Sequence, residues 1–283
     1  MRLACLHLPA LPLQVEVRAH PELLGRAVAV VAGADDASEH PRVVACSRAA
    51  FEAGIRPGMS PGQARQLADD AVMVPGSPGR WRDEVVSLAE EIGALAPGSD
   101  GRGVDLSEAL SGPRLLPNAV LFAEVPSGQR SDRFARRLLD IAARRGYLGR
   151  VGVAWDRFTA RAAARMRDEE PVVVVARGRS AEFLAPLPLE LLPLREEVRS
   201  LLRAAGVRTL GQFAALPPPS VGRATDAVDY RELARGNGPS ELVRAPALRA
   251  RRATLPARPR ASDLAGERQL RLAEDGGPLR LAG

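Results

Sequence analysis

The chain has 283 residues, of which 46% are hydrophobic, so it is long enough for about two globular domains and too apolar for a disordered protein. All 40 basic residues are arginine and 34 residues are acidic, but in this lysine-free chain the net charge of +6 does not by itself indicate nucleic-acid binding. The two cysteines lack a metal-ligand spacing, and no run of about 18 apolar residues occurs, so we expect a cytoplasmic protein without a zinc site or a membrane segment.

The N-terminal quarter of the chain predicts three strands and a helix. Leu3 to Leu8 is a short apolar run ended by Pro9, which predicts a buried strand that stops abruptly. Ala27 to Ala32 and Arg42 to Cys46 predict two more strands, separated by a polar loop. A helix is predicted from Ser60 to Ala68, because serine followed by proline is typical of a helix start.

The middle of the chain alternates helices and strands. Amphipathic spacing predicts helices from Asp83 to Leu95 and from Asp132 to Arg144. Strands are predicted from Arg150 to Ala154 and from Val172 to Ala176, and Asp156 is placed to cap a helix that runs to Arg167. This alternation predicts an α/β or α+β fold rather than an all-helical protein.

The β signal ends near residue 177, where we expect a domain boundary. Glu196 to Ala205, Thr209 to Leu216 and Tyr230 to Arg235 predict short helices joined by Gly and Pro turns. Beyond Pro246 the composition predicts a flexible tail. The segment Arg244 to Arg260 holds six arginines and no acid, and it is either a solvated linker or a phosphate-contacting segment.

Three segments, in order, carry a resemblance to a known family. They are A-G-I-R-P-G-M at 53–59, V-G-V-A-W-D-R-F-T-A at 151–160 and G-V-R-T-L-G-Q-F-A-A-L-P at 206–217. Together they resemble the fingers, palm and thumb motifs of the Y-family DNA polymerases. The resemblance implies a palm-like region at 1–20 and 71–177, a fingers-like region at 21–70 and a small helical thumb-like region at 178–245. The composition adds an Arg/Pro-rich flexible tail at 246–283.

The departures from the family pattern concern the acids that bind metal. An active Y-family palm holds two Mg²⁺ ions with carboxylates that follow the first strand and precede a later one. The resemblance puts Pro9 and Leu11 where the first two acids would lie, and Asp100 and Gly101 at the later pair. At best Asp100 survives as a vestigial catalytic residue. We therefore expect no metal site, no cofactor and no enzymatic activity.

The H-L-P-x-L-P opening and the G-I-R-P-G-M-S turn are similar to those of ImuB-like proteins, which are catalytically inactive Y-family homologues. The resemblance implies a short form without an evident little-finger domain. It also implies an adaptor role in translesion synthesis during the SOS response to DNA damage. The implied partners are DNA, an error-prone C-family DNA polymerase, a RecA-like ImuA-type accessory protein and the β sliding clamp.

Two sets of side chains are candidates for contacts with these partners. Near the end of the chain, a short segment is similar to a clamp-binding peptide, although it has no aromatic residue. The candidate DNA phosphate contacts are Arg157, Arg161, Arg208, Arg249, Arg251 and Arg252, and the candidate clamp contacts are Gln269, Leu270 and Leu272.

Two other functions remain open at this point. One is a divergent, active error-prone polymerase that uses Mg²⁺ and recruits Asp100, Asp105 and another acid such as Glu16. The other is a plain DNA-binding module built from the C-terminal helices alone. His7 lies in an apolar strand, which is more typical of a satisfied core histidine than of a ligand.

Overall fold

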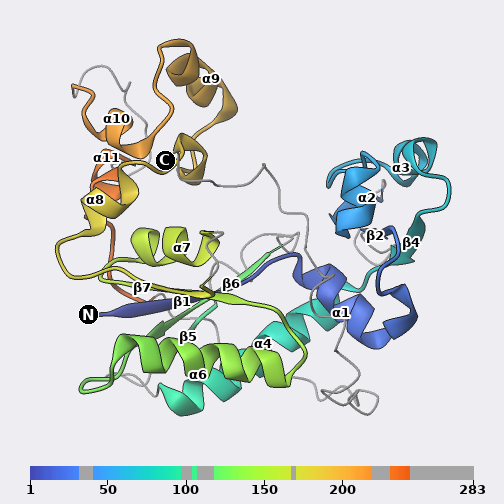
Figure 1. Cartoon of the computed structure of the whole chain (residues 1–283), viewed down its shortest axis with the longest axis horizontal. Helices are drawn as coiled ribbons and strands as arrows, with labels where there is room; N and C mark the ends of the chain where they lie inside the picture. Colours follow the sequence, from blue (N-terminus) through green and yellow to red (C-terminus); the bar gives the residue numbers. More distant parts are fainter. Residues whose placement is uncertain (32–40, 97–103, 107–117, 167–169, 218–229, 243–283) are drawn as a thin grey trace.

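A five-stranded sheet forms the centre of the molecule (Figure 1). The structure is a computed structural model, and it describes residues 1–31, 41–96, 104–106, 118–166, 170–217 and 230–242. The strand order is β5-β6-β1-β7-β8. β1 pairs antiparallel with β6 and β7, whereas β7 and β8 are parallel. The strands are β1 (Leu3–Leu8), β5 (Val104–Asp105), β6 (Ala119–Glu124), β7 (Arg150–Ala154) and β8 (Val172–Val174).

Helices cover both faces of this sheet (Figure 1). On one face, α4 (Pro78–Leu95) and α6 (Ser131–Arg144) pack against Leu6 and Leu8 of β1. On the other face, α7 (Arg157–Arg165) packs against Leu3 and Cys5. Alternate residues of β1 therefore serve two cores, which explains why the whole strand is buried and, apart from His7, apolar.

One glycine of the central sheet allows α7 to approach closely. A Cβ atom on Gly152 of β7 would lie 2.1 Å from the carbonyl oxygen of Ala160 and 2.4 Å from the backbone nitrogen of Ala164. Any larger residue would push α7 away from the sheet. The same helix carries Arg157, Arg161 and Arg165, so this contact sets the height of their backbone above the sheet.

A smaller sheet with the order β3-β2-β4 lies beside the central one (Figure 1). Its strands are β2 (Val28–Val31), β3 (Val43–Cys46) and β4 (Val72–Pro75), with β2 and β3 antiparallel and β2 and β4 parallel. Two short helices, α2 (Arg48–Glu52) and α3 (Pro61–Leu67), accompany it. A capping box between Ser60 and Gln63 begins α3, as the Ser-Pro pair predicts. Helix α1 (Leu11–Ala19) and the 3₁₀ helix η1 (Pro21–Leu23) connect the two sheets.

The C-terminal part of the described chain is a helical unit with its own core. Leu184, Leu189, Leu210 and Phe213 are among the residues that fill this core. A capping box that joins Thr209 to its third helical residue begins α10. The elements are α8 (Ser180–Leu184), η2 (Leu189–Leu191), α9 (Glu196–Ala204), α10 (Leu210–Ala214) and α11 (Tyr230–Ala234).

The predicted α/β class is confirmed, and most predicted elements occur within a few residues of their expected ends. Helix α4 begins earlier than predicted, and strand β8 and helices α7 and α10 are shorter. The division into regions near residue 177 stays a prediction, and the predicted tail at 246–283 lies outside the described residues. No helix in the described part of the chain is long and apolar enough to cross a membrane.

Candidate functional site

Charged side chains gather on the side of the central sheet that faces α7. His7 of β1 is 1% exposed and pairs in register with Val120 of β6 and Arg150 of β7. Burial, followed by the positive charges of Arg165, Arg161 and Arg150, lowers the pKa of His7 from 6.5 to about 3. The imidazole is therefore neutral at physiological pH, as expected for a core histidine, and the three arginines add to the effect of burial.

The three arginines around His7 come from two elements. Arg161 and Arg165 lie one turn apart on α7, and Arg150 is the first residue of β7. Arg157 continues the same four-residue spacing at the start of α7, so the helix carries a basic stripe along one side. A positive stripe beside a buried sheet is an arrangement that attracts phosphate groups.

The first arginine of this stripe forms a buried ion pair. Arg157 contacts the carboxylate of Asp105 on β5, and its guanidinium carbon lies 4.1 Å from the centre of the Phe122 ring. The Asp105 side chain is fully buried, and Asp105 pairs in register with Phe122. Because a buried charge is costly unless it is paired, each partner stabilises the other here. The Arg157 guanidinium thus faces Asp105 and Phe122 in the interior, and its phosphate contact stays a prediction.

The N-terminal end of α7 is fixed by a second buried acid. Asp156 caps the helix, since its Oδ1 accepts a 2.8 Å hydrogen bond from the backbone N–H of Thr159. Its Oδ2 accepts a 3.2 Å hydrogen bond from the hydroxyl of Ser180 on α8. Burial raises the pKa of Asp156 above its usual value. The backbone N–H of Arg157 also donates to the carbonyl of Pro239 at 3.0 Å, so the helical unit and α7 are held together.

The end of β1 carries no carboxylate at the two positions that the family pattern assigns to acids. Pro9 and Leu11 are both buried. Between them, Ala10 adopts a left-handed conformation with φ 43, the one positive φ among the described non-glycine residues, and its N–H donates to Asn118 Oδ1 at 2.8 Å. Strained backbone of this kind is concentrated at functional sites.

The described residues do not fit a magnesium site. No group of three or more His, Cys, Asp or Glu side chains in the described ranges could hold a metal ion. The carboxylate of Asp105 is engaged by Arg157, and that of Glu16 accepts hydrogen bonds from Arg80 and Trp81 on α4. Each of these two carboxylates is thus held by other protein groups in the described structure, and their part in a metal cluster with Asp100 stays a prediction.

The remaining predicted site residues are dispersed. Arg161 belongs to the stripe on α7, whereas Arg208 is exposed in the separate helical unit. The pattern analysis missed Arg165 and Arg150; the four-residue spacing from Arg161 could have indicated the former, but only strand pairing places the latter. The predicted residues that lie outside the described part of the chain are Asp100, Gly101, Arg249, Arg251, Arg252, Gln269, Leu270 and Leu272.

Sequence comparison relates the chain to a family and to curated proteins. Residues 6–165 match the model of the impB/mucB/samB family, abbreviated IMS. The chain is 27% identical over 212 residues to DNA polymerase IV of Dehalococcoides mccartyi strain CBDB1, covering 74% of this chain and 51% of that protein. It is 29% identical over 206 residues to DNA polymerase IV of Stenotrophomonas maltophilia strain K279a, covering 70% and 51%. The chain thus spans about half the length of the curated relatives it matches.

Solved structures share the fold. DinB from Sulfolobus solfataricus superposes with a TM-score of 0.70 at 16% identity, covering 86% of this chain and 70% of that one. The insertion ternary complex of Dbh DNA polymerase gives a TM-score of 0.65 at 18% identity, covering 86% and 69%. The mixed α/β fold is therefore that of the Y-family polymerases, as predicted.

These relatives overturn one prediction from the sequence. We expected a protein without enzymatic activity, because the acids of the family pattern are replaced. The curated relatives described above are named DNA polymerase IV, which is the name of an enzyme, so the comparisons contradict the expectation of a non-enzyme. That expectation rests on the replaced positions Pro9, Leu11 and Gly101, whereas the remaining candidate acid, Asp100, lies outside the described part of the chain.

Proposed function

Because the chain belongs to the impB/mucB/samB family of Y-family DNA polymerase homologues, we propose that it is a divergent error-prone polymerase that extends primers during DNA damage tolerance. The observation that carries the proposal is the match over residues 6–165, which include the central sheet up to β7 and the basic stripe of α7. The activity itself is proposed by analogy with relatives of which the alignment with this chain covers about half.

The basic stripe supplies the chemistry that such a substrate requires. Primer–template DNA and an incoming nucleotide are both polyanions, and arginine binds phosphate with a planar, multiply donating group. We assign phosphate contacts to Arg161, Arg165 and Arg150, whose charges already converge on His7. Arg208, on the helical unit, is a further candidate for a contact with the DNA backbone.

Metal binding is a separate part of the proposal. Template-directed nucleotidyl transfer in this family uses Mg²⁺, which prefers carboxylate and other oxygen ligands. Of the acids named from the sequence, Asp100 is the candidate that the described structure leaves open. The described residues alone do not form a metal site.

Primer extension tests the proposal directly. The purified chain is incubated with a labelled primer on an undamaged or an abasic template, with Mg²⁺ or Mn²⁺. We expect template-directed incorporation that Asp100→Ala abolishes and that Arg161→Ala weakens. Arg136→Ala, an exposed arginine on α6 across the sheet, is the matched control and should retain wild-type extension. Failure of the wild-type chain to incorporate any nucleotide with either metal would refute the proposal.

DNA binding is measured independently of catalysis. Fluorescence anisotropy at several salt concentrations gives the number of phosphate contacts, since each lost contact lowers the salt slope by about one. Arg161→Ala and Arg165→Ala should each reduce this slope, and Arg136→Ala should not. Equal slopes for all variants would remove the basic stripe from the DNA-binding surface.

We further propose an adaptor role that accompanies the polymerase activity. The support for this role is the resemblance of the H-L-P-x-L-P opening and the G-I-R-P-G-M-S turn to ImuB-like proteins. The partners implied by the ImuB-like motifs are an error-prone C-family polymerase, a RecA-like accessory protein and the β sliding clamp. A pull-down from DNA-damaged cells should recover at least one of them, and a chain carrying Gln269→Ala with Leu272→Ala should lose the clamp. Recovery of none would refute the adaptor role.

A further inference from the structure

Helix α1 follows the end of β1 directly and lies between the two sheets. Its residues 11–17 are all buried, and the helix contacts β2, β3 and α4. A buried helix with polar residues needs a partner for each polar group. Gln14 satisfies this requirement at one end, since its amide group exchanges hydrogen bonds with the backbone of Leu148 at 3.0 and 2.6 Å and donates to the carbonyl of Pro9 at 2.7 Å.

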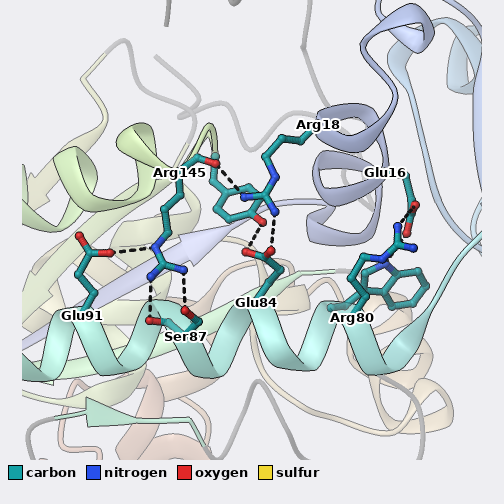
Figure 2. Close-up of polar contacts among 9 residues, drawn as sticks. Glu16, Arg18, Arg80, Glu84, Ser87, Glu91 and Arg145 are labelled. Atoms are coloured by element: carbon teal, nitrogen blue, oxygen red, sulfur yellow. Dashed lines mark hydrogen bonds and ion pairs between the residues drawn. The ribbon is translucent and has the colours of Figure 1, made fainter. Parts of the chain in front are cut away.

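Two further polar residues of α1 meet successive turns of α4 (Figure 2). Arg18 contacts Glu84, whose other oxygen accepts a 2.6 Å hydrogen bond from the hydroxyl of Tyr147. Burial, together with the negative charge of Glu84, raises the pKa of Tyr147, so the phenol stays protonated and donates. This cluster fastens α1 to the helices beneath the central sheet.

The other contact is made by Glu16, whose side chain is 3% exposed. Its Oε1 accepts a 3.0 Å hydrogen bond from the indole N–H of Trp81, and its Oε2 accepts a 3.1 Å bond from Arg80. Both donors are at the start of α4. Each oxygen of this buried carboxylate has its own donor, one charged and one neutral. Loss of either donor would leave an oxygen without that hydrogen bond in the interior, so both contacts hold the side chain in place.

The indole that binds Glu16 also touches the smaller sheet. A Cβ on Gly76, directly after β4, would lie 2.1 Å from Cζ2 of Trp81 and 2.8 Å from Cγ1 of Val30 on β2. The backbone N–H of Gly76 donates to the carbonyl of Val31 at 2.8 Å. The Trp81 ring is thus wedged between α1 and the edge of the smaller sheet, where only a glycine leaves room for it.

We propose that Glu16 and Trp81 form a joint that sets the position of the smaller sheet relative to the central sheet, and that they are positioning residues for the incoming nucleotide. The role in nucleotide positioning rests on the proposed polymerase function, since the resemblance places the fingers-like region at 21–70. The positioning of the two sheets rests on geometry alone. Glu16 fixes the indole from α1, and the indole in turn fixes the end of β4.

Spin labels test the joint without any requirement for activity. Cysteines replace Leu67 on α3, which is 50% exposed, and Arg136 on α6, which is also exposed; the native Cys5 and Cys46 are buried. The distance distribution between the two labels should broaden in Glu16→Gln, which keeps an acceptor for the indole but loses the charge that holds Arg80. Trp81→Phe, which removes the indole N–H, should broaden it as well.

A matched control separates positioning from general destabilisation. Glu91 lies on the same helix and bonds Arg144 and Arg145 at the end of α6, away from the smaller sheet. Glu91→Gln should therefore leave the distribution as in the wild-type chain. In primer extension, Glu16→Gln should raise the KM for the nucleotide several-fold with little change in kcat, whereas Glu91→Gln should change neither.

The outcomes distinguish the two parts of the inference. Wild-type distributions in both Glu16→Gln and Trp81→Phe, with circular dichroism showing folded protein, would overturn the joint. If Glu16→Gln does not fold, Trp81→Phe and Arg80→Ala decide the matter by the same measurement. Broadened distributions in a chain that extends no primer would support the joint and refute only the polymerase proposal. Broadening with an unchanged KM would overturn the nucleotide-positioning role.

Discussion

The low pKa of His7 predicts a specific loss of stability in mild acid. In the folded chain this pKa is about 3, and the ordinary value of 6.5 applies to the unfolded chain. Below pH 6.5 the unfolded state binds a proton that the folded state does not. The contribution of His7 to stability is therefore complete above pH 6.5 and is lost progressively as the pH falls toward 3.

The size of this effect follows from the two pKa values. Between pH 7.5 and pH 5, protonation of His7 in the unfolded state lowers the free energy of unfolding by about 2 kcal/mol. Little of this is lost to solvent screening, because His7 is 1% exposed. For a domain of ordinary stability, about 2 kcal/mol is a large fraction of the total free energy of unfolding.

Urea unfolding at pH 7.5, 6 and 5 measures this loss. The variant His7→Leu removes the titrating group from an apolar strand, so its free energy of unfolding should fall by about 2 kcal/mol less than that of the wild-type chain between pH 7.5 and 5. His20→Gln is the matched control, because the His20 side chain is 52% exposed, and it should show the wild-type loss. Equal losses in the wild-type chain and His7→Leu would refute the reasoning.

Three substitutions around α7 test the packing that holds the site. Gly152→Ala should destabilise the chain by about 3 kcal/mol in thermal unfolding, because the new methyl group meets the backbone of α7; an unchanged melting temperature would contradict this. Asp105→Asn should cost about 3 to 5 kcal/mol in urea unfolding by removing the buried negative charge opposite Arg157, and the double variant Asp105→Leu with Arg157→Met should cost less than the single one. Asp156→Ala should cost about 1 kcal/mol by removing the cap of α7, and a neutral result would show that the cap is dispensable.

The sequence predicts those helices and strands that bury one face and expose the other. Helices such as α6 have a buried face and a polar face, so their periodicity is visible in the residues. Helix α1 was missed because residues 11–17 are buried all round, including Gln14 and Glu16, and its pattern has no polar face. Strand β6 was missed because its apolar run lacks the alternation of a half-exposed strand.

The site is harder to predict than the elements, because it depends on contacts distant in the sequence. Asp105 and Arg157 could each be singled out, one as a possible metal ligand and the other as a phosphate contact. Their ion pair joins residues 52 positions apart and changes both interpretations. Likewise, Arg150 reaches His7 only through the pairing of β7 with β1. Family motifs predict the order of such strands. They do not predict which charged side chains form ion pairs with other residues of the same protein.

The same arginines that depress the pKa of His7 are those assigned to phosphate, and this couples the two properties. A phosphate group bound beside Arg161, Arg165 and Arg150 would offset their positive field and raise the pKa of His7 from about 3. The chain has 3 histidines, so the His7 resonances can be followed by NMR during titration with primer–template DNA. We expect the pKa of His7 to rise when DNA binds to the wild-type chain. In the double variant Arg161→Ala with Arg165→Ala, addition of DNA should leave the pKa of His7 unchanged. By linkage, DNA affinity must increase as His7 becomes protonated. A pKa that does not move when DNA is bound would place the phosphates elsewhere, and the basic stripe of α7 would then have only a structural role.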